Sequence, residues 1–249
     1  MLPLHDDNPT GRTPWVTYAL IALNVLVFGY QLMLPDAGLA GFYATFAVVP
    51  KELFQDFALL QAGRPVGPLD MAPLLTSMFL HGGLMHVGGN MLFLYIFGDN
   101  VEDRLGHGLY LAFYLIAGVA ASLAHAWSGP GSVLPSLGAS GAIGGVLGAY
   151  IVLHPQARVT TLVFLGVLIT TVRVPAFVFL GIWFAIQSLQ GLADLGAQTT
   201  ATEGGTAWWA HIGGFVFGMG VGAMARLLPG RRDLAVGRAD DIRRISNRR

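Results

Sequence analysis

Ser140 and His211 lie in stretches without charged residues, in a chain of 249 residues that is 54% hydrophobic and only 11% charged. A hydroxyl or an imidazole is costly inside a membrane unless it pairs or lines a water-filled cavity, so such residues are functional candidates. Serine and histidine together are also the minimal pair for nucleophilic acyl transfer. The two residues therefore predict a hydrolase whose active site lies below the membrane surface.

The surroundings of Ser140 suit a nucleophile at the start of a helix. It stands in the sequence LGASG at 137–141, where Gly138 and Gly141 let the backbone turn tightly and approach a neighbour closely. The first N–H groups of a helix that begins here are unpaired and, with the positive end of the helix dipole, suit an oxyanion. Ordinary packing of small residues is the other interpretation of this sequence, which also lacks the GxSxG pattern of a nucleophile elbow.

His211 begins a stripe of small residues on the last apolar segment, and a similar stripe follows Ser140. The stripes are formed by Gly214, Gly218 and Gly222 in one segment and by Gly141, Gly145 and Gly148 in the other. Small residues at this spacing let two membrane helices pack closely, which would bring Ser140 and His211 within hydrogen-bond reach. The alternative is a histidine that bonds a backbone carbonyl at the membrane interface, beside the aromatic pair Trp208 and Trp209.

The acidic residues near the predicted spans are not placed to orient His211. They fall at the ends of spans, as Asp99, Glu102, Asp103 and Asp194. We therefore expect a Ser–His dyad in which packing and hydrogen bonds, rather than a buried carboxylate, position the imidazole.

His86 and Asn90 are four residues apart and share one face of a predicted helix. An apolar helix that turns both side chains to one side needs a polar object there. Both side chains can donate a hydrogen bond to a developing oxyanion. The alternative is a metal site of His81, His86 and His211, but the five-residue spacing of the first two is off-face and no acidic or cysteine ligand accompanies them.

Windows without charge define the elements that must position these residues. A soluble domain carries roughly 25% charged residues, whereas this chain has 14 basic and 14 acidic residues sorted to the ends of long apolar segments. A spanning helix needs about 20 apolar residues, and the turn-rich stretch 128–135 divides the longest window in two. We predict an all-α polytopic membrane protein with six spans, at about 14–34, 73–98, 108–127, 139–153, 174–193 and 206–227.

Arginine placement orients these spans. With six spans, both termini share the side that collects Arg12, Arg104, Arg158, Arg173 and the eight arginines of 226–249. The positive-inside rule makes this side cytoplasmic, and Ser140, His211 and His86 then lie at similar depth near the outer face. The apolar stretch 159–172 is a seventh candidate; we expect a re-entrant or interfacial piece or an extension of the fifth helix.

The chain divides into three predicted parts. These are a short cytoplasmic N-terminus at 1–13, a membrane domain at 14–228 with an outer loop at 35–70 that dips into the interface, and an Arg-rich cytoplasmic tail at 229–249. The first span has no clear cleavage site and is expected to remain as an anchor. The absence of cysteine excludes disulfides and thiolate chemistry. Thirteen arginines against one lysine hint at a GC-rich bacterial genome, hence an inner-membrane protein.

Three blocks of the sequence resemble the signature motifs of the rhomboid intramembrane serine proteases. They are HGGLMHVGGNMLFLYIFGDNVEDRLG, SLGASGAIGGVLGAY and AWWAHIGGFVFG. The blocks are similar in order and spacing to those of the family, and the resemblance covers roughly residues 12–228. A GxSG motif with HxxxN upstream and AHxxG downstream, on three membrane helices, is very specific.

The resemblance implies a six-helix rhomboid-like bundle that cleaves transmembrane-helix substrates near the outer membrane face. It implies Ser140 as nucleophile and His211 as base, with His86, Asn90 and the Ser140 N–H as an oxyanion hole and Gly138 shaping the approach. The implied partners are transmembrane protein substrates and the lipid bilayer, with a lateral substrate gate beside the fifth span. No metal, ATP or other cofactor is implied, and no nucleic acid.

Two places in the sequence depart from the family pattern. Gly144 stands where an aromatic residue often stacks on the base, so something else must pack His211, and Ala72-Pro73 replace a common Trp-Arg pair. The alternative function is a catalytically silent rhomboid-like protein that binds membrane clients, which loss of the serine or histidine would signal. A transporter would show intramembrane acidic residues or inverted repeats, and we see neither.

Overall fold

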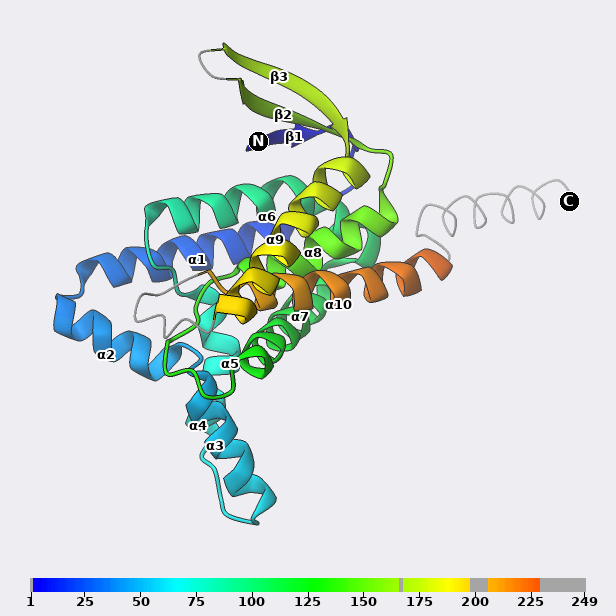
Figure 1. Ribbon diagram of the computed structural model, residues 1–249. Helices are drawn as coiled ribbons and strands as arrows, with labels where there is room; N and C mark the ends of the chain where they lie inside the picture. The colour runs from blue at the N-terminus through cyan, green and yellow to red at the C-terminus, as the bar shows by residue number, and fades with distance from the viewer. Residues whose placement is uncertain (1, 166–167, 198–205, 229–249) are drawn as a thin grey trace, which may run out of the picture.

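The fold is a bundle of long apolar helices. The computed structural model describes residues 2–165, 168–197 and 206–228. The long helices are α1 (Trp15–Met33), α6 (Leu84–Leu105), α7 (His107–Ser128), α8 (Ser140–Leu153), α9 (Ala176–Ala197) and α10 (Trp208–Leu227). Helix α8 lies in the middle, with α6, α7, α9 and α10 around it (Figure 1), and its residues from Gly141 to Tyr150 are all buried.

Helices α8 and α10 pack backbone against backbone. A Cβ atom built on Gly214 would lie 2.0 Å from the Gly141 carbonyl oxygen, and one on Gly218 would lie 1.9 Å from the Gly145 oxygen. No side chain fits at these positions, because real Cβ atoms essentially never approach so closely. The small-residue stripes are therefore the contact surface between the two helices, as their spacing predicts.

Among the residues that the structure describes, four helices are long and apolar enough to cross a membrane: α1, α7, α9 and α10. Helix α8 is apolar but has only 14 residues. Helix α6 has 22 residues, and its last turns carry the charged residues Asp99, Glu102, Asp103 and Arg104. The chain is thus a mostly helical, multi-pass membrane protein.

Helix α6 begins later than predicted. The expected span 73–98 instead contains the short helices α5 (Pro73–Thr76) and η1 (Ser77–Phe79), and α6 starts only after Gly83, whose backbone is extended. The turn between them is held by Gln31 of α1. Its Oε1 accepts from the His81 N–H at 3.1 Å, and its Nε2 donates to the His81 carbonyl at 2.8 Å. As a result, His86 stands in the first turn of α6.

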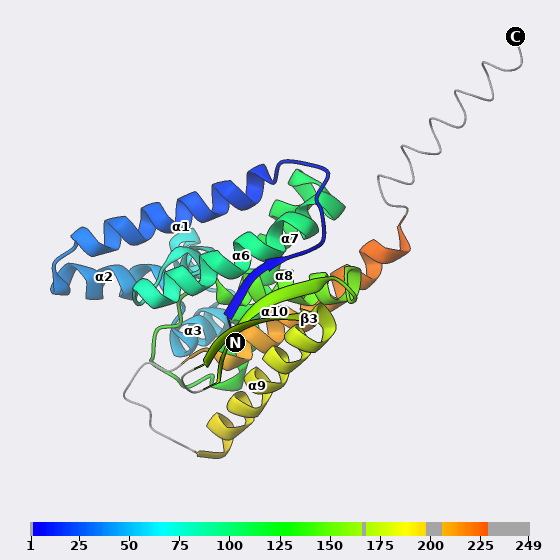
Figure 2. The same ribbon diagram turned by 90° about the horizontal axis from the view of Figure 1, so that it is seen from above.

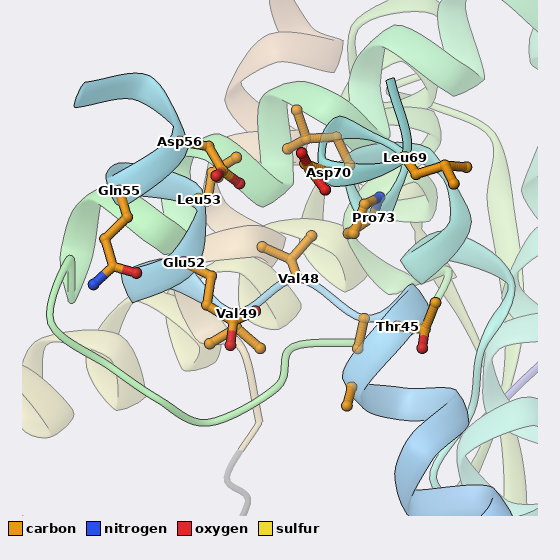
Figure 3. Close-up of a pocket in the computed structure, with 13 residues that line it drawn as sticks. Thr45, Val48, Val49, Glu52, Leu53, Gln55, Asp56, Leu69, Asp70 and Pro73 are labelled. Carbon is orange, nitrogen blue, oxygen red and sulfur yellow. The ribbon is translucent and has the colours of Figure 1, made fainter. Parts of the chain in front are cut away.

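The segment predicted as an outer loop is largely helical. It contains α2 (Asp36–Phe46), α3 (Pro50–Gln61) and α4 (Pro68–Met71). Figure 2 shows α2 turning back beside the C-terminal end of α1, where Tyr43 donates to the His81 carbonyl at 3.0 Å. A cavity of about 380 Å³ opens among these helices, with Glu52, Asp56 and Asp70 on its wall (Figure 3). Its wall is built from residues 44–74 only, so it is separate from Ser140.

The seventh candidate segment forms β-structure, so the expectation of an all-α fold is wrong in this part. Strands β2 (Arg158–Leu165) and β3 (Leu168–Pro175) pair antiparallel, and β1 (Leu2–Asp6) pairs with β2. The sheet and α3 lie on opposite sides of the bundle (Figure 1). An extension of the fifth helix is excluded, because α9 begins at Ala176, after the strand. The predicted tail 229–249 lies outside the described residues.

The N-terminal segment is fastened to α6 and α8 by polar contacts. Tyr150 of α8 donates a hydrogen bond to the Asp6 carboxylate, and the Asn100 amide donates to the same oxygen at 3.2 Å. Burial raises the pKa of Asp6 above its usual value, and the hydrogen bond from Tyr150 partly offsets this rise. The Glu102 carboxylate accepts from the N–H groups of Val16 and Thr17 at 2.9 and 2.8 Å, so it caps the start of α1.

Candidate active site

Ser140 and His211 are in direct contact. Ser140 is the first residue of α8, and His211 lies in the first turn of α10, so the close packing of the two helices brings their starts together. The His211 Nε2 atom lies 2.7 Å from the Ser140 Oγ atom. The His211 side chain is buried, with 8% exposed, whereas Ser140 is half-buried. This is the hydrogen-bonded geometry that an activated serine requires.

The other ring nitrogen of His211 is held by Gln187, a residue that no sequence motif indicates. The Gln187 Oε1 atom on α9 lies 2.6 Å from His211 Nδ1. An amide oxygen only accepts hydrogen bonds, so the proton resides on Nδ1 and Nε2 is left as the acceptor for the serine hydroxyl. The contact therefore selects the tautomer that a general base needs. The signal in the sequence is weak, because Gln187 is one of two glutamines in a largely apolar stretch, with Gln190 three residues later.

Aromatic side chains pack the imidazole in place of the residue missing at position 144. The ring centres of Trp183 and Trp208 lie 5.9 and 6.1 Å from that of His211. A Cβ atom on Gly144 would lie 2.9 Å from the His211 carbonyl oxygen. The close approach of α8 and α10 therefore leaves no room for an aromatic ring at position 144, and the packing comes from α9 and α10 instead.

His86 lies against the loop that precedes Ser140. A Cβ atom on Gly138 would lie 2.8 Å from both Cε1 and Nε2 of the His86 ring and 3.7 Å from the Ser140 Oγ atom. Gly138 has φ +130°, which L side chains rarely adopt. The Gly82 N–H donates to His86 Nδ1 at 3.4 Å, a long contact that leaves Nε2 as the protonated nitrogen facing Gly138.

Asn90 is also turned inward, one helical turn after His86. Its side chain is 8% exposed, and its Nδ2 atom is buried without a hydrogen-bond partner. Buried donors without a partner are uncommon and require a reason. The N–H groups in the first turn of α8 likewise have no partner within the helix. The Asn90 amide and these N–H groups are therefore available to donate hydrogen bonds to a ligand oxygen.

A small void adjoins Ser140. It has a volume of about 20 Å³ and is lined partly by the hydroxyl-bearing residues Ser77, Ser122, Ser136 and Ser140. A void needs roughly 10–15 Å³ and polar partners to hold one water molecule. The void therefore has the size and polarity for a single water beside the serine.

The histidines proposed as an alternative metal site are differently arranged. The rings of His81 and His86 meet edge to face at 5.1 Å, and both ring nitrogens of His81 are buried without a partner. Within residues 2–165, 168–197 and 206–228, no group of three His, Cys, Asp or Glu side chains could hold a metal ion.

The fold and the site define a multi-pass membrane protein with a serine hydroxyl and an imidazole paired between its helices. The family model of the Rhomboid domain matches residues 68–227, and the chain belongs to the rhomboid family. The matched region includes every candidate site residue.

The chain is similar to rhomboid proteins from several organisms. It is 31% identical over 211 residues to "Rhomboid protein 1, mitochondrial" of Saccharomyces cerevisiae, covering 82% of this chain and 51% of that protein. It is 33% identical over 183 residues to "Rhomboid protease GluP" of Bacillus subtilis, covering 74% and 32%. The human "Presenilin-associated rhomboid-like protein, mitochondrial" is 32% identical over 165 residues, covering 63% and 38%.

The chain spans between about a third and a half of the length of these three relatives. Two of the relatives are named as mitochondrial and one is bacterial, so family membership by itself does not place this chain in a bacterial inner membrane.

Proposed function

We propose that this protein is an intramembrane serine endopeptidase that cleaves transmembrane-helix substrates near the outer membrane face. The observation that carries the proposal is the 2.7 Å contact between His211 Nε2 and Ser140 Oγ, with Nδ1 occupied by Gln187. Membership of a family that includes a relative named as a protease supports it.

In the proposed reaction, Ser140 Oγ attacks the carbonyl carbon of the scissile peptide bond while His211 Nε2 takes the hydroxyl proton. His211 then gives this proton to the leaving amine nitrogen, and the peptide C–N bond breaks. Water attacks the acyl-enzyme with His211 again acting as base, which releases the second product and restores the serine. The void beside Ser140 offers a place for this water.

The negative charge that develops on the carbonyl oxygen needs hydrogen-bond donors. We assign this role to the Ser140 N–H, the His86 imidazole and the Asn90 amide, with Gly138 giving the carbonyl access. The unpartnered Nδ2 of Asn90 and the contact of Gly138 with the His86 ring support the assignment. Such donors stabilise the transition state more than the substrate, because the charge exists only there.

We propose that all six long helices span the membrane, with the loop at 35–70 partly embedded and both termini cytoplasmic. Helix α8 has 14 residues, which gives about 21 Å at 1.5 Å per residue, less than the roughly 30 Å of the hydrocarbon core. If the C-terminal end of α8 lies at the cytoplasmic surface, Ser140 at the other end of this short helix lies below the outer surface. We further propose that the protein lies in a bacterial inner membrane, because its thirteen arginines against one lysine are typical of a GC-rich bacterial genome.

The proposed partners are transmembrane protein substrates within the lipid bilayer. The chemistry requires no metal, cofactor or nucleic acid, because a base, a nucleophile and oxyanion donors are supplied by side chains and backbone. A catalytically silent protein that binds membrane clients is the alternative. The paired serine and imidazole favour the enzyme, since client binding does not require a hydroxyl poised against a base.

The test compares wild type, Ser140→Ala and His211→Ala after reconstitution in liposomes with a model transmembrane substrate, without metal or nucleotide. We expect cleavage by wild type and a loss of at least about 10³-fold in either variant. Ser188→Ala is the matched control, because its hydroxyl bonds only its own helix, to the Phe184 carbonyl. It should cleave like wild type.

Labelling with a fluorophosphonate gives a second readout of the same pair. Wild type and Ser188→Ala should be labelled at Ser140, and Ser140→Ala should not. Cleavage that survives Ser140→Ala would refute the mechanism. A wild type that neither cleaves nor labels would support the client-binding alternative.

A further inference from the structure

We propose that Gln187 is a positioning residue that makes the base competent only while α9 is docked against α10. This inference rests on the proposed function, and it extends the Ser–His dyad to a third side chain on a separate helix. The juxtaposition that carries it is the contact between Gln187 Oε1 and His211 Nδ1 at 2.6 Å.

Gln187 faces inward although its helix faces outward. It is 7% exposed, and it is the one buried polar side chain of α9 among the described residues. Around it, apolar residues of α9 are exposed, as a helix against lipid requires; these are Ile182, Ile186, Leu189, Leu192 and Leu195. A glutamine turned away from lipid and toward a bundle needs a polar partner, and His211 is that partner.

The contact determines two properties of the base. The amide oxygen holds the proton on Nδ1, so that Nε2 can accept the proton of Ser140. It also fixes the rotation of the imidazole ring about its bond to the backbone, because both nitrogens now point at defined atoms. In serine hydrolases with a triad, a buried carboxylate has this role; here a neutral amide fulfils it.

A second contact from the same face of α9 acts together with Gln187. Trp183 lies one helical turn before it, and its ring packs 5.9 Å from the His211 ring. Position 144 carries glycine and cannot supply an aromatic ring there. Both the packing on one side of the imidazole and the acceptor for Nδ1 therefore come from α9.

The consequence concerns α9 as a whole. A displacement of this helix would remove Gln187 and Trp183 from His211 together, because both contacts come from α9. The base would then lose its fixed tautomer and its ring orientation.

The test uses Gln187→Leu, Gln187→Glu and the matched control Gln190→Leu in the reconstituted full-length protein. Leucine has nearly the volume of glutamine but cannot accept from Nδ1, whereas glutamate keeps an acceptor oxygen. Gln190 lies on the same helix and is exposed, so its replacement tests the effect of the substitution alone. The readouts are kcat and KM for the model substrate, the rate of fluorophosphonate labelling of Ser140, and the thermal unfolding midpoint.

We expect Gln187→Leu to lower kcat by about 10- to 100-fold with KM within about twofold, as for a misplaced catalytic group. Labelling of Ser140 should slow in parallel, while the unfolding midpoint stays at that of Gln190→Leu. Gln187→Glu should restore most of the lost kcat. A merely structural role would instead lower the unfolding midpoint and would not be rescued by glutamate.

Two outcomes overturn the inference, and they are distinguishable from each other. An active wild type with equal kcat in Gln187→Leu and Gln190→Leu shows that the amide does not position the base, and leaves the proposed peptidase intact. A wild type that neither cleaves nor labels removes the proposed function itself, and this inference with it.

Discussion

The His86 ring packs against Gly138, two residues before Ser140. A Cβ atom on Gly138 would lie only 2.8 Å from the Cε1 and Nε2 atoms of this imidazole. The absence of a side chain at position 138 therefore sets the place of the His86 ring. The same glycine has φ +130°. One residue thus combines a backbone conformation that favours glycine with the clearance that a proposed oxyanion donor needs.

Gly138→Ala is expected to abolish most activity, because the new methyl group displaces His86 and strains the backbone. We expect kcat to fall by about 10²–10³-fold, the cost of losing one oxyanion donor. The measurement is cleavage of the model substrate. Gly131→Ala is the control, since a Cβ atom there would meet nothing within 4 Å; equal activity of the two variants would contradict the prediction.

Asn90→Leu is expected to separate activity from stability. The Nδ2 atom of Asn90 is buried and has no hydrogen-bond partner. Replacement by leucine therefore removes an unsatisfied donor and breaks no hydrogen bond made by that atom. We expect an unfolding midpoint no lower than that of wild type and a kcat reduced by about 10²-fold. A lower midpoint with unchanged kcat would assign Asn90 a structural role.

Gly218→Ala is expected to separate α8 from α10. The new Cβ atom would lie 1.9 Å from the Gly145 carbonyl oxygen, so the helices must move apart. Overpacking of this kind costs about 1–3 kcal/mol, and the displacement should also lengthen the Ser140–His211 contact and lower kcat. Thermal unfolding and cleavage measure both effects. Gly220→Ala, on the same helix in open space, should retain both properties.

Asp6→Asn is expected to raise stability at neutral and alkaline pH. Burial raises the folded-state pKa of Asp6 above its unfolded value. The protonated acid is therefore the form that the fold favours: its stabilising contribution is complete below the unfolded pKa and is lost as pH rises through the folded pKa. Asparagine stays neutral and keeps an oxygen to accept from Tyr150, so it avoids this loss.

The check is the thermal unfolding midpoint in detergent between about pH 4 and pH 8. The gain of Asp6→Asn over wild type should be largest at the alkaline end and should shrink toward the acid end. A gain that grows as the pH falls would contradict the sign of the predicted shift.

The pairing of Ser140 with His211 could be predicted because it depends on helix packing over short repeats. Glycines at intervals of three and four residues mark the contact face of each helix, and the contact fixes which residues meet. Gln187 could not be predicted in this way. Gln190 follows three residues later and is equally polar, so the sequence alone does not indicate which of the two faces His211.

The helices were predictable from apolar length, but the start of α6 and the sheet were not. Helix α6 begins after Gly83 rather than at residue 73, because hydrophobicity does not distinguish a spanning helix from short apolar turns before it. The sheet was missed because β1 pairs with a strand about 155 residues away: Leu2 lies opposite Leu162. Non-local strand pairing is not visible in local periodicity.

The glycine contact between α8 and α10 has a consequence for how this protein can change over evolutionary time. The close approach of the two helices is made there by main-chain atoms, whereas the outward side of α10 presents exposed residues such as Val216 and Met224. Substitutions on that outer side can adapt the protein to bilayers of another thickness or lipid composition without moving the reacting atoms. One helix can therefore change its lipid-facing residues during evolution while its catalytic histidine stays in the same place.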